Sequence, residues 1–106
     1  MTIERRKSPR KPADLPVRCM ADGRSFPGRL RDICRDAALV EVHEALPLDA
    51  RVVLTVDLPG AGTVEVAGRV IRVTEGEGDA RSMAVLFTDA TPAAATRIDL
   101  FLSREG

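Results

Sequence analysis

The chain has very few aromatic side chains. Tryptophan and tyrosine are absent from its 106 residues, and the three phenylalanines are Phe26, Phe87 and Phe101. Each phenylalanine occupies a position that the surrounding apolar pattern assigns to the interior. Proteins that bind single-stranded nucleic acid stack bases on exposed aromatic rings. The sequence therefore disfavours nucleic acid as a partner, although its basic N-terminus could attract a phosphate backbone.

Histidine and cysteine are also scarce. His43 is the single histidine, and Cys19 and Cys34 are the two cysteines. These residues are too few for a structural zinc site, and no Ser-His-Asp triad or other nucleophile–base pair can be assembled from the sequence. The alternation around His43 places it on the same, solvent-facing side as Glu41. We predict a non-enzymatic protein with no metal and no cofactor, in which both thiols are reduced and packed.

Long apolar runs are missing as well. No run approaches the roughly 18 residues of a membrane span, and the polar, basic N-terminus lacks the apolar stretch of a secretory signal. We therefore expect no membrane insertion and a cytoplasmic location. A length of 106 residues suits one domain with a hydrophobic core of its own.

Charge is distributed unevenly, although the formal net charge is zero. Residues 1–31 hold nine basic and three acidic side chains, a net charge of +6, and the other 75 residues have a net charge of −6. This asymmetry is typical of a surface that meets an anion. It is equally consistent with a solvated arm that neutralises the rest of the chain.

Apolar residues alternate with polar ones along most of the sequence, which predicts six short strands and a small antiparallel β-barrel. The period slips near Asp32 and again near Ile71, as it does at bulges or strand ends. Thr91 and Pro92 begin a helix that ends the chain, because threonine is a good N-cap and proline suits the first turn. We expect a flexible basic arm over residues 1–13 and a barrel domain over 14–106, with the helix at about 91–104. The expected strands cover residues 15–20, 26–31, 38–42, 52–58, 64–73 and 83–87.

Two arginines stand four residues apart in the arm, Arg6 and Arg10. In an extended chain they lie on one side, about 13 Å apart, and Pro9 stiffens the segment between them. A guanidinium binds phosphate or the O6/N7 edge of guanine through two parallel hydrogen bonds. The arm thus suits a compact anion that carries guanine, although an Arg-x-x-x-Arg spacing alone is frequent by chance.

Several segments in the same order and spacing resemble the PilZ family over nearly the whole chain. They are Arg5-Arg6-Lys7-Ser8-Pro9-Arg10, Leu15-Pro16-Val17, Gly28-Arg29-Leu30-Arg31-Asp32-Ile33-Cys34, Gly68-Arg69-Val70-Ile71-Arg72 and Ala84-Val85-Leu86-Phe87. The resemblance implies a bacterial six-stranded β-barrel with a C-terminal helix. Typical members bind the second messenger cyclic di-GMP through Arg-x-x-x-Arg and Asp/Asn-x-Ser-x-x-Gly.

By this resemblance, Arg6 and Arg10 would hold guanine edges and phosphates, and Asp32 would accept hydrogen bonds from a guanine. Cys34 stands where the family has serine, and Ala37 where it has glycine. A thiol is a weak donor, so the lost hydrogen bond would cost about 1.5–3 kcal/mol. If the glycine position requires a positive φ, alanine costs about 1 kcal/mol more. Three basic residues are candidates for auxiliary contacts: Arg5, Lys7 and Arg72.

Two functions follow from the resemblance. The first is a single-domain receptor or adaptor that binds cyclic di-GMP, with weakened affinity, and relays it to a protein partner controlling motility, biofilm or secretion. The second is a degenerate scaffold that binds no nucleotide and acts through constitutive protein contacts. In that case Cys34 is a small buried residue that closes a turn, and Asp32 only caps the backbone.

Overall fold

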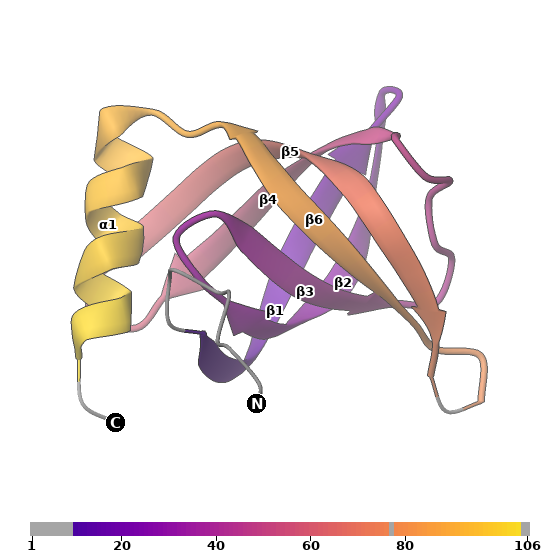
Figure 1. Cartoon of the computed structure of the whole chain (residues 1–106), viewed down its shortest axis with the longest axis horizontal. Coiled ribbons are helices and arrows are strands. Elements are labelled where there is room, and N and C mark those ends of the chain that lie inside the picture. Colours follow the sequence, from indigo (N-terminus) through magenta and orange to yellow (C-terminus); the bar gives the residue numbers. More distant parts are fainter. Residues whose placement is uncertain (1–9, 77, 105–106) are drawn as a thin grey trace, which may run out of the picture.

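Six antiparallel strands form a closed barrel, in the order β1-β2-β3-β6-β5-β4, and one helix lies across one end (Figure 1). The computed structural model describes residues 10–76 and 78–104. This architecture confirms the all-β barrel with a C-terminal helix predicted from the sequence. The elements are β1 (Lys11–Ala21), β2 (Arg24–Ile33), β3 (Ala37–Val42), β4 (Arg51–Leu58), β5 (Gly62–Glu75), β6 (Arg81–Asp89) and α1 (Pro92–Ser103).

The barrel interior is built by every second residue of each strand. In β4, Val52, Leu54, Val56 and Leu58 are all at most 5% exposed, while the residues between them lie on the outer surface. Burial of each such side chain stabilises the fold by about 1.5–3 kcal/mol. Met83 fills the same interior from β6. The alternation in the sequence therefore predicted correctly which residues of β4 form the core. Phe26 and Phe87, which the pattern also assigned to the interior, are partly buried and pack against it.

Bulges interrupt this alternation at the predicted places. The register shifts between Leu30 and Asp32 in β2, and between Val70 and Arg72 in β5. A bulge adds one residue to a strand and changes the direction in which the following side chains point. A third register shift, between Pro12 and Leu15, lies within β1. It explains why alternation alone placed the start of this strand at residue 15, four residues too late.

Helix α1 begins as the sequence predicted. The Thr91 side chain accepts a hydrogen bond of 3.1 Å from the Ala94 backbone N–H, which satisfies one of the free donors of the first turn. Ala94, Ile98 and Phe101 are buried and join the hydrophobic core of the barrel. The apolar stripe of α1 thus packs against the barrel. Within residues 10–76 and 78–104, no helix is long and apolar enough to cross a lipid bilayer.

The C-terminal end of α1 is held by Lys11, at the start of β1. Its Nζ donates hydrogen bonds of 2.9 Å and 3.0 Å to the backbone oxygens of Phe101 and Arg104, and lies 4.3 Å from the centre of the Phe101 ring. Carbonyls of the last helical turn lack partners within a helix, and a cation there complements the helix dipole. Lys11 therefore joins the beginning of the barrel to the end of α1.

Candidate functional site

A row of paired residues crosses four strands on the outer face of the barrel. Asp32 in β2 lies opposite Leu39 in β3, and Leu39 lies opposite Ala84 in β6. Ala84 in turn lies opposite Arg72 in β5. Three interstrand spacings separate the ends of the row, about 14 Å in all. Asp32 and Arg72, which are distant in the sequence, thus lie at the two ends of an apolar strip formed by the two residues between them.

This row forms the floor of a shallow hollow of about 160 Å³, which we call the Asp32 hollow. Four of the residues that line it, namely Arg10, Asp32, Cys34 and Ala37, belong to the motif positions noted in the sequence, and Arg72 is one of the auxiliary candidates. The full lining comprises Arg10, Asp32, Cys34, Ala37, Ala38, Leu39, Ile71, Arg72 and Ala84.

Arg10 is held over the hollow by Asp32. Its Nη1 donates a hydrogen bond of 3.1 Å to the Asp32 Oδ2, and the two side chains are 39% and 20% exposed. A partly exposed ion pair of this kind contributes at most about 1 kcal/mol. A guanidinium has five N–H donors, so this contact leaves most of the donors of Arg10 available to a ligand. The pair orients Arg10 without saturating it.

Cys34 and Ala37 form the tight turn between β2 and β3. The Cys34 backbone N–H donates a 2.8 Å hydrogen bond to the Ala37 carbonyl oxygen, and Cys34 is 8% exposed. Among the described residues other than glycine, the two with positive φ are Asp22 and Asp49. Ala37 is therefore accommodated at the start of β3 without the backbone strain considered from the sequence. Its methyl group instead adds bulk to the wall of the hollow.

Arg72 is positioned by the bulge of β5. The extra residue there is Ile71, whose side chain is 49% exposed. Within the part of the chain that the structure describes, the side chain of Arg72 makes no hydrogen bond and no ion pair. Its guanidinium is thus available at the end of the hollow opposite Asp32.

Two apolar residues that line the hollow, Leu39 and Ile71, were not proposed as site residues from the sequence. Their positions on the outward-facing side of the strand pattern could have indicated them.

The remaining predicted positions, Arg5, Arg6 and Lys7, lie outside the described residues, as does most of the predicted arm over 1–13. The division between arm and barrel stays a prediction. No group of three metal-binding side chains occurs among residues 10–76 and 78–104.

Part of the positive charge in the N-terminal third is neutralised on the barrel surface. Arg29 and Arg31 donate hydrogen bonds of 2.6 Å and 3.0 Å to Asp14, and Arg31 also binds Glu41 at 2.6 Å. The hydrogen bond from Arg29 lowers the pKa of Asp14, and the one to Glu41 raises the pKa of Arg31. These two arginines are therefore occupied, whereas Arg10 and Arg72 retain free donors at the Asp32 hollow.

Comparison with known proteins identifies the family of this barrel. A sequence model of the PilZ domain matches residues 4–104. The chain belongs to the PilZ domain family. No curated protein matches this sequence.

Solved structures share the fold of this PilZ domain. The inhibitor of motility MotI/DgrA of Bacillus subtilis superposes with a TM-score of 0.82 at 16% identity, over 94% of this chain and 50% of that one. The PilZ domain of YcgR from Escherichia coli, solved with c-di-GMP, gives a TM-score of 0.72 at 18% identity, over 93% and 89%. The MrkH–c-di-GMP complex of K. pneumonia gives 0.75 at 20% identity, over 94% and 52%. The chain thus spans about half the length of MotI/DgrA and MrkH.

Proposed function

We propose that this PilZ domain binds cyclic di-GMP in the Asp32 hollow and relays its presence to a protein partner. The observation that carries the proposal is the convergence of Arg10, Asp32 and Arg72 on one outer-face hollow. The ligand is a dianion with two guanine bases, and the hollow offers two guanidinium groups and one carboxylate. Its c-di-GMP-bound structural neighbours YcgR and MrkH support the same ligand class.

Each group has a chemical role in this proposal. The Asp32 carboxylate accepts hydrogen bonds from the N–H groups of a guanine. Arg10, and Arg6 from the preceding segment, bind phosphate or the acceptor edge of guanine through two parallel hydrogen bonds. Arg72, with Arg5 and Lys7 as further auxiliary cations, supplies positive charge. Leu39 and Ala84 offer an apolar surface between the polar ends.

Binding is weaker than in a domain with the complete motif. Cys34 presents a thiol where a hydroxyl would donate to phosphate, which costs about 1.5–3 kcal/mol or roughly tenfold to a hundredfold in affinity. Ala37 adds one methyl group to the hollow but no backbone strain. We therefore assign most of the loss to Cys34.

No catalytic step is part of this proposal, and the location that fits it is the bacterial cytoplasm. The alternative is a scaffold that contacts its partner constitutively. Two observations favour this alternative: Cys34 is buried, and Arg10 is already paired with Asp32. These motif residues therefore have contacts within the protein and do not require a ligand.

Calorimetric titration of cyclic di-GMP separates the two functions. The receptor predicts heat of binding for the wild type and at least a tenfold loss for Arg10→Ala and for Asp32→Asn. Arg24→Ala is the matched control, because Arg24 lies at the start of β2, beside the hairpin turn at Asp22 and Gly23, and does not line the Asp32 hollow. No heat with the wild type at high protein concentration would leave the scaffold as the function.

A further inference from the structure

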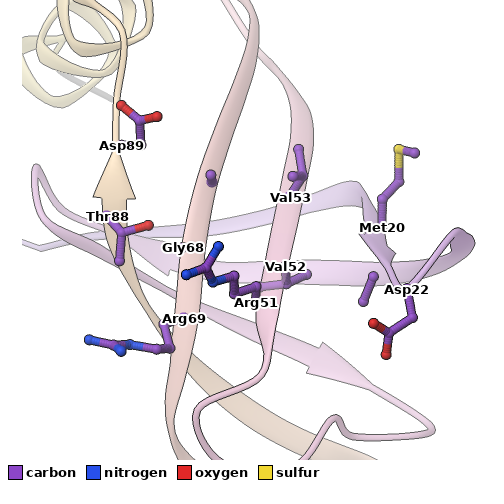
Figure 2. A pocket seen from close by; sticks show the side chains of 11 residues that line it. Met20, Asp22, Arg51, Val52, Val53, Gly68, Arg69, Thr88 and Asp89 are labelled. Atoms are coloured by element: carbon purple, nitrogen blue, oxygen red, sulfur yellow. The ribbon is translucent and has the colours of Figure 1, made fainter.

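A second hollow, of about 610 Å³, lies on the outer face of β1, β4, β5 and β6 (Figure 2). We call it the Arg51 hollow. Arg51 in β4 lies directly opposite Arg69 in β5, and like charges in that relation destabilise a strand pair. Asp49 forms an ion pair of 4.0 Å with Arg69, and Arg51 makes no ion pair with any described residue. This arrangement leaves positive charge available to an external anion.

The floor beside the arginine pair is apolar. Met20 in β1 lies opposite Val53 in β4, and Val53 lies opposite Ala67 in β5. Met20 is 43% exposed, so part of this apolar floor is open to solvent. In the view of Figure 2, the Arg51 side chain extends across β5 toward Thr88, which lies at a bulge of β6. The hollow therefore combines an apolar floor, two guanidinium groups and a hydroxyl.

A direct strand-to-strand connection links the Arg51 hollow to the Asp32 hollow. Leu86 in β6 lies opposite Ala37 on one side and opposite Arg69 on the other. Ala37 lines the Asp32 hollow and Arg69 the Arg51 hollow, so two interstrand spacings, about 10 Å, separate the two walls. Leu86 itself is 37% exposed. The two hollows are therefore separated by the width of β6 at Leu86.

We propose that the Arg51 hollow docks a peptide segment of a protein partner, in which an apolar side chain stands beside a carboxylate. The apolar side chain packs on the exposed Met20 and on Val53, and the carboxylate binds the arginine pair, of which Arg51 makes no ion pair with any described residue. Asp22 and Asp89 also line the hollow; in Figure 2, Asp22 lies to the right of Arg51 and Asp89 above Thr88. They select a segment with basic residues around the central acid. Docking is independent of the proposed nucleotide binding, whereas its regulation by the nucleotide rests on it.

Titration of the ¹⁵N-labelled protein by NMR tests the docking. The probe is an acetylated, amidated tetrapeptide of lysine, leucine, glutamate and lysine, and the control peptide has glutamine in place of glutamate. We expect shifts centred on Met20, Val53 and Ala67, and at least tenfold weaker binding of the control peptide. Arg51→Gln and the double variant with Arg69→Gln should lose the same factor, whereas Arg81→Gln, outside the hollow, should not.

Equal affinity for the two peptides, or full affinity in the folded Arg51→Gln variant, overturns the docking proposal. The amide spectrum of each variant establishes that it is folded, and the single variant provides the test if the double variant is not. Repeating the titration with cyclic di-GMP tests regulation: we expect several-fold tighter peptide binding in the wild type and no change in Arg10→Ala. Peptide binding without any nucleotide binding overturns only the proposed function, and nucleotide binding without peptide binding overturns only the docking.

Discussion

Replacement of Cys34 by serine should strengthen nucleotide binding and weaken the fold. The Cys34 side chain is 8% exposed and lines the Asp32 hollow beside Arg10. A hydroxyl at this position donates a hydrogen bond to a phosphate oxygen, which a thiol does poorly. A hydrogen bond to a charged group contributes about 1.5–3 kcal/mol. The dissociation constant for cyclic di-GMP should therefore fall by roughly tenfold to a hundredfold.

The same change has a cost in the free protein. A buried hydroxyl without a partner destabilises a fold by about 1–3 kcal/mol, which lowers the melting temperature of a domain of this size by several degrees. Adding Ala37→Gly should change affinity little, because Ala37 has no positive φ to relieve. That glycine should cost about 0.5–1 kcal/mol of stability, since glycine weakens a strand.

Calorimetric titration and thermal unfolding of the wild type, Cys34→Ser and Cys34→Ser/Ala37→Gly measure these quantities. The single variant should show nearly the whole gain in affinity. Equal affinity of wild type and Cys34→Ser would refute it, and so would a gain that appears only when Ala37→Gly is added. In the latter case the methyl group of Ala37, and not the thiol, limits binding.

Three further predictions concern the barrel itself. Lys11→Met should lower the free energy of unfolding by about 1–3 kcal/mol in urea, because the backbone oxygens of Phe101 and Arg104 lose their hydrogen bonds from Nζ. An unchanged midpoint would show that water replaces Nζ. Burial raises the pKa of Cys19 to about 11, so an alkylating reagent should modify Cys34 before Cys19. Cyclic di-GMP should slow the reaction of Cys34, because Cys34 lines the Asp32 hollow. Faster labelling of Cys19 would contradict its burial. Asp14→Asn should destabilise the protein at neutral pH but not in acid. Because its pKa is lowered in the folded protein, the Asp14 carboxylate stabilises the fold at pH values above its unfolded pKa, near 3.8. That contribution is lost as the pH falls through the pKa of the folded state. A difference in urea unfolding that does not change with pH would contradict this sign.

Most of the fold could be predicted from the sequence because its signals are local. A period of two places alternate residues on opposite faces of a strand, and Val52, Leu54 and Val56 follow it without interruption. The hairpin at Asp22 and Gly23 shows φ values of 52° and 74°, which this residue pair favours in a two-residue turn. The first four residues of β1 escaped prediction, because the bulge after Pro12 breaks the alternation there.

The candidate site was predictable only in part. The motif positions Arg10 and Asp32 lie 22 residues apart in the sequence, and the antiparallel pairing of β1 with β2 brings them together. Arg72 was a weaker candidate, because its place across the hollow from Asp32 depends on the two strands between them. The strain considered for Ala37 depended on a backbone angle that no residue pattern reveals, and the structure shows it to be absent.

The sequence by itself therefore determined the strands, the turns, the cap of α1, the inward-facing residues and the family. Tertiary structure alone decided which outward-facing residues meet. Barrel closure and the bulges at Leu30–Asp32 and Val70–Arg72 set the register that aligns Asp32 with Arg72, and the β4–β5 pairing sets Arg51 against Arg69. A shift of one residue in any strand would turn these side chains to the other face. Register between strands distant in sequence is a property of the closed barrel, and both hollows depend on it.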